Sequence, residues 1–161
     1  MTGRARVFGD DINTDYIITS RRKRESLDPA VLRAYLFEEI DAKFAATVAA
    51  GDVIVAGKNF GCGSAMEVAV TAVVGAGIRA VVARSFARTY YRNAVNNGLL
   101  PVECDTGGIR EGDRLAIGDG KVRNETTGEI LTAAELPAIM REIIAAGGLV
   151  AYFRRHGDFV V

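Results

Sequence analysis

Short runs of consecutive apolar residues alternate with stretches of helical periodicity through the middle of the chain. The runs Val53–Ala56, Ile78–Ala83 and Leu99–Cys104 are typical of strands that are buried in a sheet. Residues 65–74 and 85–97 repeat their apolar positions at helical spacing, and each of these stretches is followed by glycine. This alternation predicts an α/β fold in which a partly parallel sheet is flanked by helices.

The two ends of the chain predict elements of a different kind. Residues 4–18 have the pattern of a short strand, an acidic turn and a second strand, and Asp28-Pro29 then predicts the start of a helix. Residues 113–131 are broken into short segments by glycines, which indicates a small β-meander. Thr132–Glu135 has the spacing of a capping box, so the last helix is expected to begin there.

The composition fits one globular domain that spans residues 1–161, since 49% of the residues are apolar and 25% are charged. Basic and acidic residues both number 20, and this balance disfavours binding to nucleic acid or to a membrane surface. No apolar run is long enough to span a bilayer, and the first residues lack the apolar core of a signal peptide. We therefore expect a cytoplasmic protein.

Few side chains of the sequence are suited to binding a metal or activating a nucleophile. The chain has one histidine, His156, and two cysteines, Cys62 and Cys104. These cannot form a zinc site of the usual kind or supply four thiolates to an iron–sulfur cluster. We expect no metal site in this chain, and any catalytic machinery that needs one to lie elsewhere.

The glycine-rich segment Gly57–Ser64, between a predicted strand and a predicted helix, is the strongest local signal. Its glycines allow the backbone to approach a ligand, and a helix N-terminus favours an anion, although a tight turn has the same composition. Ser64 fits two interpretations: a capping box with Glu67, or a reactive hydroxyl. Cys62 has the character of a small buried residue rather than a nucleophile.

Two groups of basic residues remain. Arg21–Arg24 is either a solvated stretch or a mobile loop that brings guanidinium groups to carboxylates. Arg84, Arg88 and Arg92 are spaced to line one face of a helix, where salt bridges are expected.

Several of these segments together match a known family. They are Gly9–Ile18, Gly57–Ser64, Ile78–Arg88, Tyr91–Ala94 with Asn97–Leu99, and Ala145–Val150. In this combination the chain resembles the small subunit of 3-isopropylmalate dehydratase and homoaconitase, the swivel-domain half of the aconitase superfamily. The resemblance covers nearly the whole chain.

The resemblance implies a swivelling β/β/α domain that works with a large subunit, as a heterodimer or a heterotetramer. The large subunit would carry a 4Fe-4S cluster, and this chain would bind no cofactor itself. The reaction would be the dehydration and rehydration of a small hydroxy dicarboxylate, with leucine biosynthesis as the commonest setting. Ser64 matches the catalytic serine of the family, whose alkoxide removes a proton from the carbon next to a carboxylate.

The resemblance also implies a set of substrate-binding residues. Counting from Ile18 places Arg24 at the family's substrate-binding arginine, with the register uncertain by one residue. Where the family pattern around Ser64 has a serine and a carboxylate-binding arginine, this sequence has Ala65 and Met66. We expect basic residues of the 21–24 segment to compensate. The full predicted set is Arg22, Arg24, Gly61, Cys62, Gly63, Ala65 and Met66.

Alternatives to an isopropylmalate substrate follow from these departures. Related dehydratases of the family act on other acids, namely homocitrate, methylmalate or citramalate, and 2,3-dimethylmalate. Loss of the arginine also allows a non-catalytic regulatory paralogue that binds a large subunit, although retention of Ser64 speaks against it. RNA binding through the basic segment is disfavoured by the zero net charge.

Overall fold

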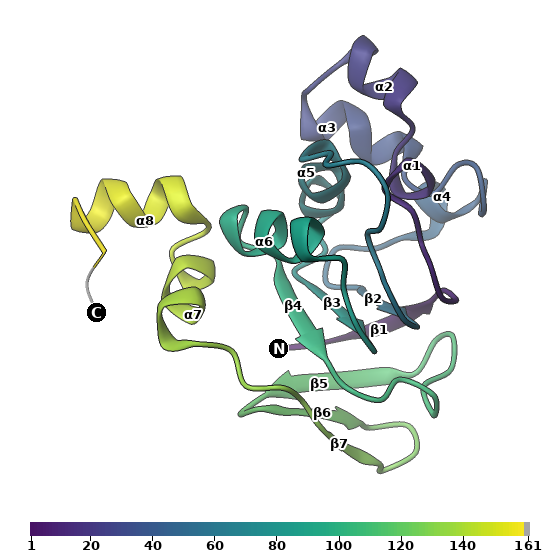
Figure 1. Ribbon diagram of the computed structural model, residues 1–161. Helices are drawn as coiled ribbons and strands as arrows, with labels where there is room; N and C mark the ends of the chain where they lie inside the picture. Colours follow the sequence, from purple (N-terminus) through teal and green to yellow (C-terminus); the bar gives the residue numbers. More distant parts are fainter. Residues whose placement is uncertain (160–161) are drawn as a thin grey trace.

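The computed structural model describes residues 1–159, in which the backbone forms a seven-stranded mixed sheet (Figure 1). The strand order is β4-β3-β2-β1-β5-β6-β7. β1 (Thr2–Val7) lies at the centre, where it pairs parallel with β2 (Val53–Ala56) and antiparallel with β5 (Arg114–Gly118). The remaining strands are β3 (Ala80–Ala83), β4 (Leu100–Glu103), β6 (Lys121–Asn124) and β7 (Ile130–Thr132).

The parallel half of the sheet, β1 to β4, is the middle layer of three. Alternate residues of β2 and β3 point to opposite faces, and both strands are buried throughout. One face packs into the main core with the helices, and the other packs against the antiparallel half, which curls over it (Figure 1). The helix-side residues are Ile54, Ala56, Val81 and Ala83, and the opposite ones are Val53, Val55, Ala80 and Val82.

The helices are short. In chain order they are α1 (Thr14–Ile17), α2 (Ser20–Glu25), α3 (Pro29–Leu32), the 3-10 turn η1 (Arg33–Tyr35), α4 (Phe44–Thr47), α5 (Val68–Gly75), α6 (Arg88–Asn96), α7 (Ala138–Ala145) and α8 (Leu149–His156). α5 and α6 cover one face of the parallel strands, whereas α7 and α8 extend away from the sheet beyond α6 (Figure 1). Within residues 1–159, no helix is long and apolar enough to cross a membrane.

The predicted α/β architecture, with a partly parallel sheet, flanking helices and a β-meander, is confirmed. The division into two β layers and one helical layer agrees with the β/β/α fold that the family resemblance implies. A single domain over residues 1–161 stays a prediction, and Val160 and Val161 lie outside the described residues.

The second strand expected within residues 4–18 is wrong, because the chain turns into α1 there. The Asn13 side chain caps α1 by accepting a hydrogen bond from the backbone N–H of Asp15 at 2.9 Å. Ile17, the last residue of α1, and Ile18, its C-cap, are buried in the main core.

The mobile loop allowed for Arg21–Arg24 is a helix, α2. The helix start expected at Asp28-Pro29 is confirmed: Asp28 accepts from the Ala30 N–H at 2.8 Å, and Pro29 is the first residue of α3.

The capping box expected at Thr132–Glu135 is not formed, since Thr132 is the last residue of β7. The chain stays extended past it because the N–H of Ala134 donates to the Glu103 carbonyl of β4 at 2.8 Å. α7 begins only after Pro137, and the carboxylate of Glu135 lies 3.9 Å from the guanidinium of Arg141. A further helix, α8, which was not expected, follows the two glycines and contains His156.

Candidate active site

Three loops gather at the carboxyl ends of the parallel strands β1, β2 and β3. They comprise residues 8–13, 57–64 and 84–87, and residues 57–64 are called the serine loop below. The carboxyl ends of parallel strands are where open α/β sheets bind their ligands. The topology therefore places Ser64, at the end of the serine loop, at the edge of the sheet that is suited to a site.

The serine loop is fastened on one side to the loop that follows β1. Backbone hydrogen bonds continue beyond the strand ends, and the N–H of Gly61 donates to the Ile12 carbonyl at 2.8 Å. The N–H of Thr14 donates to the Cys62 carbonyl at 2.8 Å, so residues 12–14 run parallel to residues 61–64 like an extra strand pair. Thr14 also donates its hydroxyl hydrogen to the Ser64 carbonyl, with an Oγ1–O distance of 2.9 Å.

The other side of the serine loop lies against the loop after β3 and against α6. The N–H of Phe60 donates to the Ser85 carbonyl at 3.0 Å, and the Phe60 carbonyl accepts from Ala87 at 2.9 Å. Gly61 has φ +78°, and its Cα lies so close to the buried ring of Tyr90 that a Cβ would be 2.2 Å from Tyr90 Cγ. Tyr90 therefore backs the loop from below, and only glycine fits above it.

Ser64 itself is exposed at the end of this frame. α5 begins at Val68, four residues later than Ser64, and its N-cap residue Glu67 makes no side-chain capping bond. The capping box of Ser64 with Glu67 is therefore wrong, because the Ser64 backbone is drawn toward Thr14 instead of entering a helix. This leaves the Ser64 hydroxyl without a protein hydrogen-bond partner among residues 1–159.

The residues near Ser64 differ in how far they are exposed to solvent. Gly63 and Ala65 are exposed, whereas Gly61 is buried. The thiol of Cys62 is half-buried, and burial together with the charge of Asp11 raises its pKa, which disfavours a thiolate nucleophile. Met66 is only 5% exposed and packs in the main core, so its side chain points away from the surface on which Ser64 lies.

The basic residues of α2 are in two different situations. The guanidinium of Arg22 makes two hydrogen bonds of 2.9 Å to the carboxylate of Glu38 and one of 2.9 Å to Glu25. It also lies 3.7 Å above the ring centre of Tyr35. The hydrogen bonds from Arg22 hold the pKa of the Glu38 carboxyl below its usual range. Arg24 is exposed and forms no ion pair within the described part of the chain.

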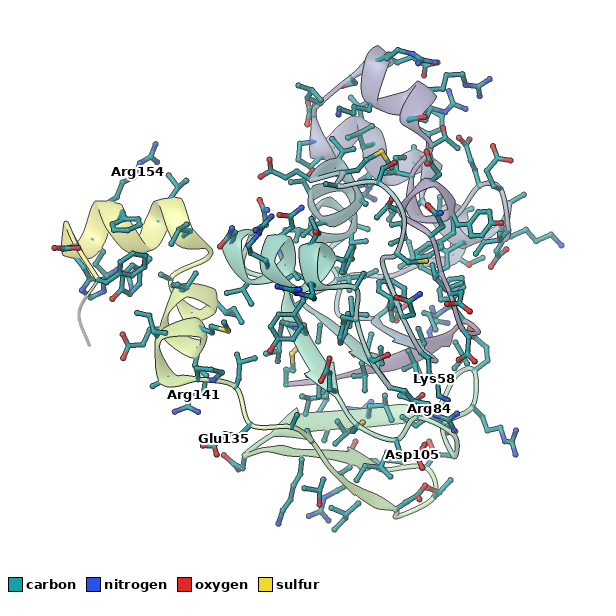
Figure 2. The ribbon with its side chains drawn as sticks, viewed as in Figure 1. Lys58, Arg84, Asp105, Glu135, Arg141 and Arg154 are labelled. Carbon is teal, nitrogen blue, oxygen red and sulfur yellow. The ribbon has the colours of Figure 1, made fainter. Side chains whose placement is uncertain are left out.

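The helix face expected from Arg84, Arg88 and Arg92 is wrong for Arg84, which follows β3 and precedes α6. Its guanidinium pairs with the carboxylate of Asp105 at 3.1 Å, and Figure 2 shows both residues near Lys58 at the carboxyl ends of the strands. Tyr90, on α6, is 2% exposed.

The donor set of residues 1–159 does not suit a metal cluster. Among residues 1–159, no three His, Cys, Asp or Glu side chains are grouped so that they could hold a metal ion. Cys62 and Cys104 are both free thiols, and burial raises the pKa of Cys104 to about 11. A cluster of four thiolate ligands has no place in this part of the protein.

Two residues of the site were not singled out from the sequence. Asn13 and Thr14 were treated as turn residues, since both types bond to nearby backbone. Their role depends on contacts to residues about 50 positions later, such as the bond from Thr14 to Ser64, which no local pattern reveals. The signal available was their place in the acidic turn of the family motif.

Known proteins that are similar to this chain show its family. The family model for the aconitase C-terminal domain matches residues 22–107. Relatives include the 3-isopropylmalate dehydratase small subunit 1 of Methanopyrus kandleri, 50% identical over 96% of this chain and 93% of that protein. The methanogen homoaconitase small subunit of Methanocaldococcus jannaschii is 47% identical over 95% of this chain and 91% of that protein.

A solved structure agrees with these matches. The crystal structure of 3-isopropylmalate dehydratase from Methanocaldococcus jannaschii superposes with a TM-score of 0.93 at 43% identity and covers 97% of this chain and 94% of that one. The chain belongs to the aconitase C-terminal domain family, among the small subunits of hydro-lyases of the 3-isopropylmalate dehydratase type. The name small subunit implies a large-subunit partner.

Proposed function

We propose that this chain, together with an iron–sulfur large subunit, interconverts hydroxy dicarboxylates by removing water and adding it back. The observation that carries the proposal is the exposed, unpartnered hydroxyl of Ser64 at the end of a loop that is fastened on both sides. The hydroxyl of a capping serine accepts a hydrogen bond from the helix backbone, whereas the hydroxyl of Ser64 is free to contact a substrate.

Ser64 acts as the base of the reaction in this proposal. Its alkoxide takes the proton from the carbon next to a carboxylate, and that C–H electron pair becomes the second bond of the alkene. The hydroxyl on the neighbouring carbon leaves as water after it takes up a second proton, which the solvent supplies. Rehydration reverses these steps, with the protonated Ser64 returning its proton. In this proposal the backbone N–H groups of the exposed residues Gly63 and Ala65 stabilise the alkoxide and a substrate carboxylate.

Arg24 binds a second carboxylate of the substrate in this proposal, since it is exposed and carries no competing ion pair within residues 1–159. Arg22 contacts the substrate only if the substrate carboxylate replaces Glu38. Gly61 and Cys62 contribute the backbone of the site, and the buried Met66 forms its floor.

The large subunit supplies the 4Fe-4S cluster, which assists departure of the hydroxyl group. The support is the similarity to proteins named as small subunits, together with residues 1–159, in which no three His, Cys, Asp or Glu side chains are grouped to hold a metal ion. We place the assembly in the cytoplasm, where the two thiols of the chain stay reduced.

The substrate is isopropylmalate, by analogy with the names of most of the relatives. Homocitrate is the second candidate. The relative named as a homoaconitase small subunit supports it, and so does α2, whose exposed side chains are mainly cationic rather than apolar.

The test is reconstitution of the complex. The chain is co-expressed with the large subunit encoded nearest to it and assembled without oxygen, and alkene absorbance is followed with isopropylmalate, homocitrate, citramalate and dimethylmalate. Ser64→Ala is the control that removes only the hydroxyl. Turnover of one acid, lost in Ser64→Ala, is the expected result and names the substrate. A stable complex that turns over none of the four points to the regulatory paralogue, and turnover that survives Ser64→Ala contradicts the role of the serine.

A further inference from the structure

Thr14 makes two hydrogen bonds to the backbone that carries Ser64. Its N–H donates to the Cys62 carbonyl at 2.8 Å, and its hydroxyl donates to the Ser64 carbonyl at 2.9 Å. These two carbonyls stand on either side of Gly63, which has φ +90°. Thr14 is 2% exposed, so both bonds are sheltered from competing water.

The hydroxyl hydrogen of Thr14 has one good acceptor. The other oxygen near it, Oδ1 of Asn13, is 3.4 Å away and already accepts from the Asp15 N–H at 2.9 Å. A threonine hydroxyl carries one hydrogen, and here it is committed to the Ser64 carbonyl. The cap that Asn13 places on α1 in turn fixes where the Thr14 side chain starts.

This bond decides the orientation of the Ser64 peptide. Without it, glycine at position 63 lets the following residues rotate freely, since glycine has the widest choice of backbone conformations. Because the peptide unit is planar, fixing the Ser64 carbonyl also fixes the direction of the Ala65 N–H on the opposite side. The Ser64 Cα, and with it the direction of the Cβ that carries the hydroxyl, is then held between two anchored carbonyls.

We propose that Thr14 is a positioning residue for Ser64: its hydroxyl holds the serine in the orientation that proton removal requires. The inference rests on the proposed function of Ser64 and adds to it a residue that does not touch the substrate. The competing interpretation is that Thr14 merely stabilises the fold, as many buried threonine hydroxyls do.

The chain offers a matched control for that interpretation. Thr106 is also buried, at 7% exposure, and its hydroxyl donates to the Ala56 carbonyl at 2.7 Å, across the same separation of 50 residues as in the bond from Thr14 to Ser64. Thr106→Val removes a bond of the same kind from a carbonyl eight residues before Ser64. Thr14→Val removes the hydroxyl with little change in shape, and Thr14→Ser keeps it.

The assembled complex of each variant is assayed with the acid that the wild type turns over, and with the same acid deuterated at the carbon that loses its proton. For Thr14→Val we expect kcat to fall about 10- to 100-fold, since small displacements of a catalytic group cost this much, while KM stays within about threefold. The isotope effect on kcat should be at least as large as in the wild type, because proton removal is the slowed step. Thr14→Ser and Thr106→Val should keep kcat within about twofold.

A kcat of Thr14→Val within twofold of the wild type overturns the inference, and so does an equal loss in Thr106→Val or in Thr14→Ser. A lowered kcat whose isotope effect collapses toward unity also contradicts it, because another step is then limiting. Each of these outcomes leaves the proposed function standing, which fails only if the wild type is inactive or Ser64→Ala is active.

A second measurement does not depend on turnover. In the full chain labelled with nitrogen-15, the order parameters of the Ser64 and Ala65 amides should fall in Thr14→Val and remain at wild-type values in Thr14→Ser and Thr106→Val. Unchanged order at both amides in Thr14→Val would show that the hydroxyl does not hold the peptide.

Discussion

Gly61→Ala tests whether the buried ring of Tyr90 fixes the path of the serine loop. The new methyl carbon would lie 2.2–2.5 Å from three side-chain atoms of Tyr90, which is so close that the loop or the tyrosine must move. Overpacking of this kind costs about 1–3 kcal/mol. Alanine at φ +78° adds about 1–2 kcal/mol of backbone strain. We therefore expect Gly61→Ala to lower the free energy of unfolding by about 2–5 kcal/mol.

The two contributions can be separated by controls within the chain. Gly128 has φ +82° and open space where a Cβ would stand, so Gly128→Ala reports the backbone strain alone and should cost about 1–2 kcal/mol. Tyr90→Leu makes room for the new methyl group. The loss in the free energy of unfolding of the double variant Gly61→Ala/Tyr90→Leu should therefore be smaller than the sum of the two single losses by about 1–3 kcal/mol.

The assay is urea unfolding of the four variants and the wild type, followed by circular dichroism and fitted with a common slope. Additivity of Gly61→Ala and Tyr90→Leu within about 0.5 kcal/mol would refute the close packing of loop and ring. An equal cost at Gly61 and Gly128 would show that the loop relaxes and that only the backbone conformation matters.

Two further predictions concern the residues around the site. Met66→Arg should not restore isopropylmalate turnover in a complex that lacks it, and should lower Tm, because position 66 is 5% exposed and would bury a guanidinium group in the apolar core; restored turnover with an unchanged Tm would contradict this. Glu38→Gln should lower Tm at pH 7, where the ion pair with Arg22 is complete. The pKa of Glu38 is lower in the folded chain than its unfolded value of about 4.3, so the contribution of the pair is full above that value and disappears as the pH falls through the folded pKa. The Tm difference between wild type and Glu38→Gln should accordingly shrink as the pH falls below about 4.3, and a constant difference would exclude the ion pair as its source.

The sheet and the order of its helices could be predicted from the sequence because the signals are local. β2 was placed at its observed bounds, since four consecutive apolar residues after a glycine leave little choice. The meander was equally clear from its glycines. Helix starts were less predictable. The spacing of Ser64 and Glu67 fits a capping box, as does that of Thr132 and Glu135. In the structure, distant groups bind these segments instead: the Thr14 hydroxyl in the first case and the Glu103 carbonyl in the second.

The candidate site, too, could be predicted only where the signal lies within one segment of the sequence. Ser64 and its glycines were identified from the family motif, whereas the anchoring role of Thr14 depends on a contact across 50 residues. The state of Arg22 also depends on tertiary structure, because Glu38 and Tyr35 approach it only after α3 and η1 have folded back. A basic run in a sequence carries no information about which of its members are already paired.

The central position of β1 has a consequence for how the chain folds during synthesis. Among the strands of residues 1–159, β1 is synthesised before the others, yet its two neighbours, β2 and β5, begin at residues 53 and 114. One edge of β1 therefore stays without a partner until the segment from residue 114 onward has been made, and unpaired strand edges are the places where nascent chains associate wrongly. In the folded protein Arg4 pairs with Asp52 and Arg6 with Glu111. Before β5 is made, the charges of these two arginines disfavour pairing of the free edge with another chain.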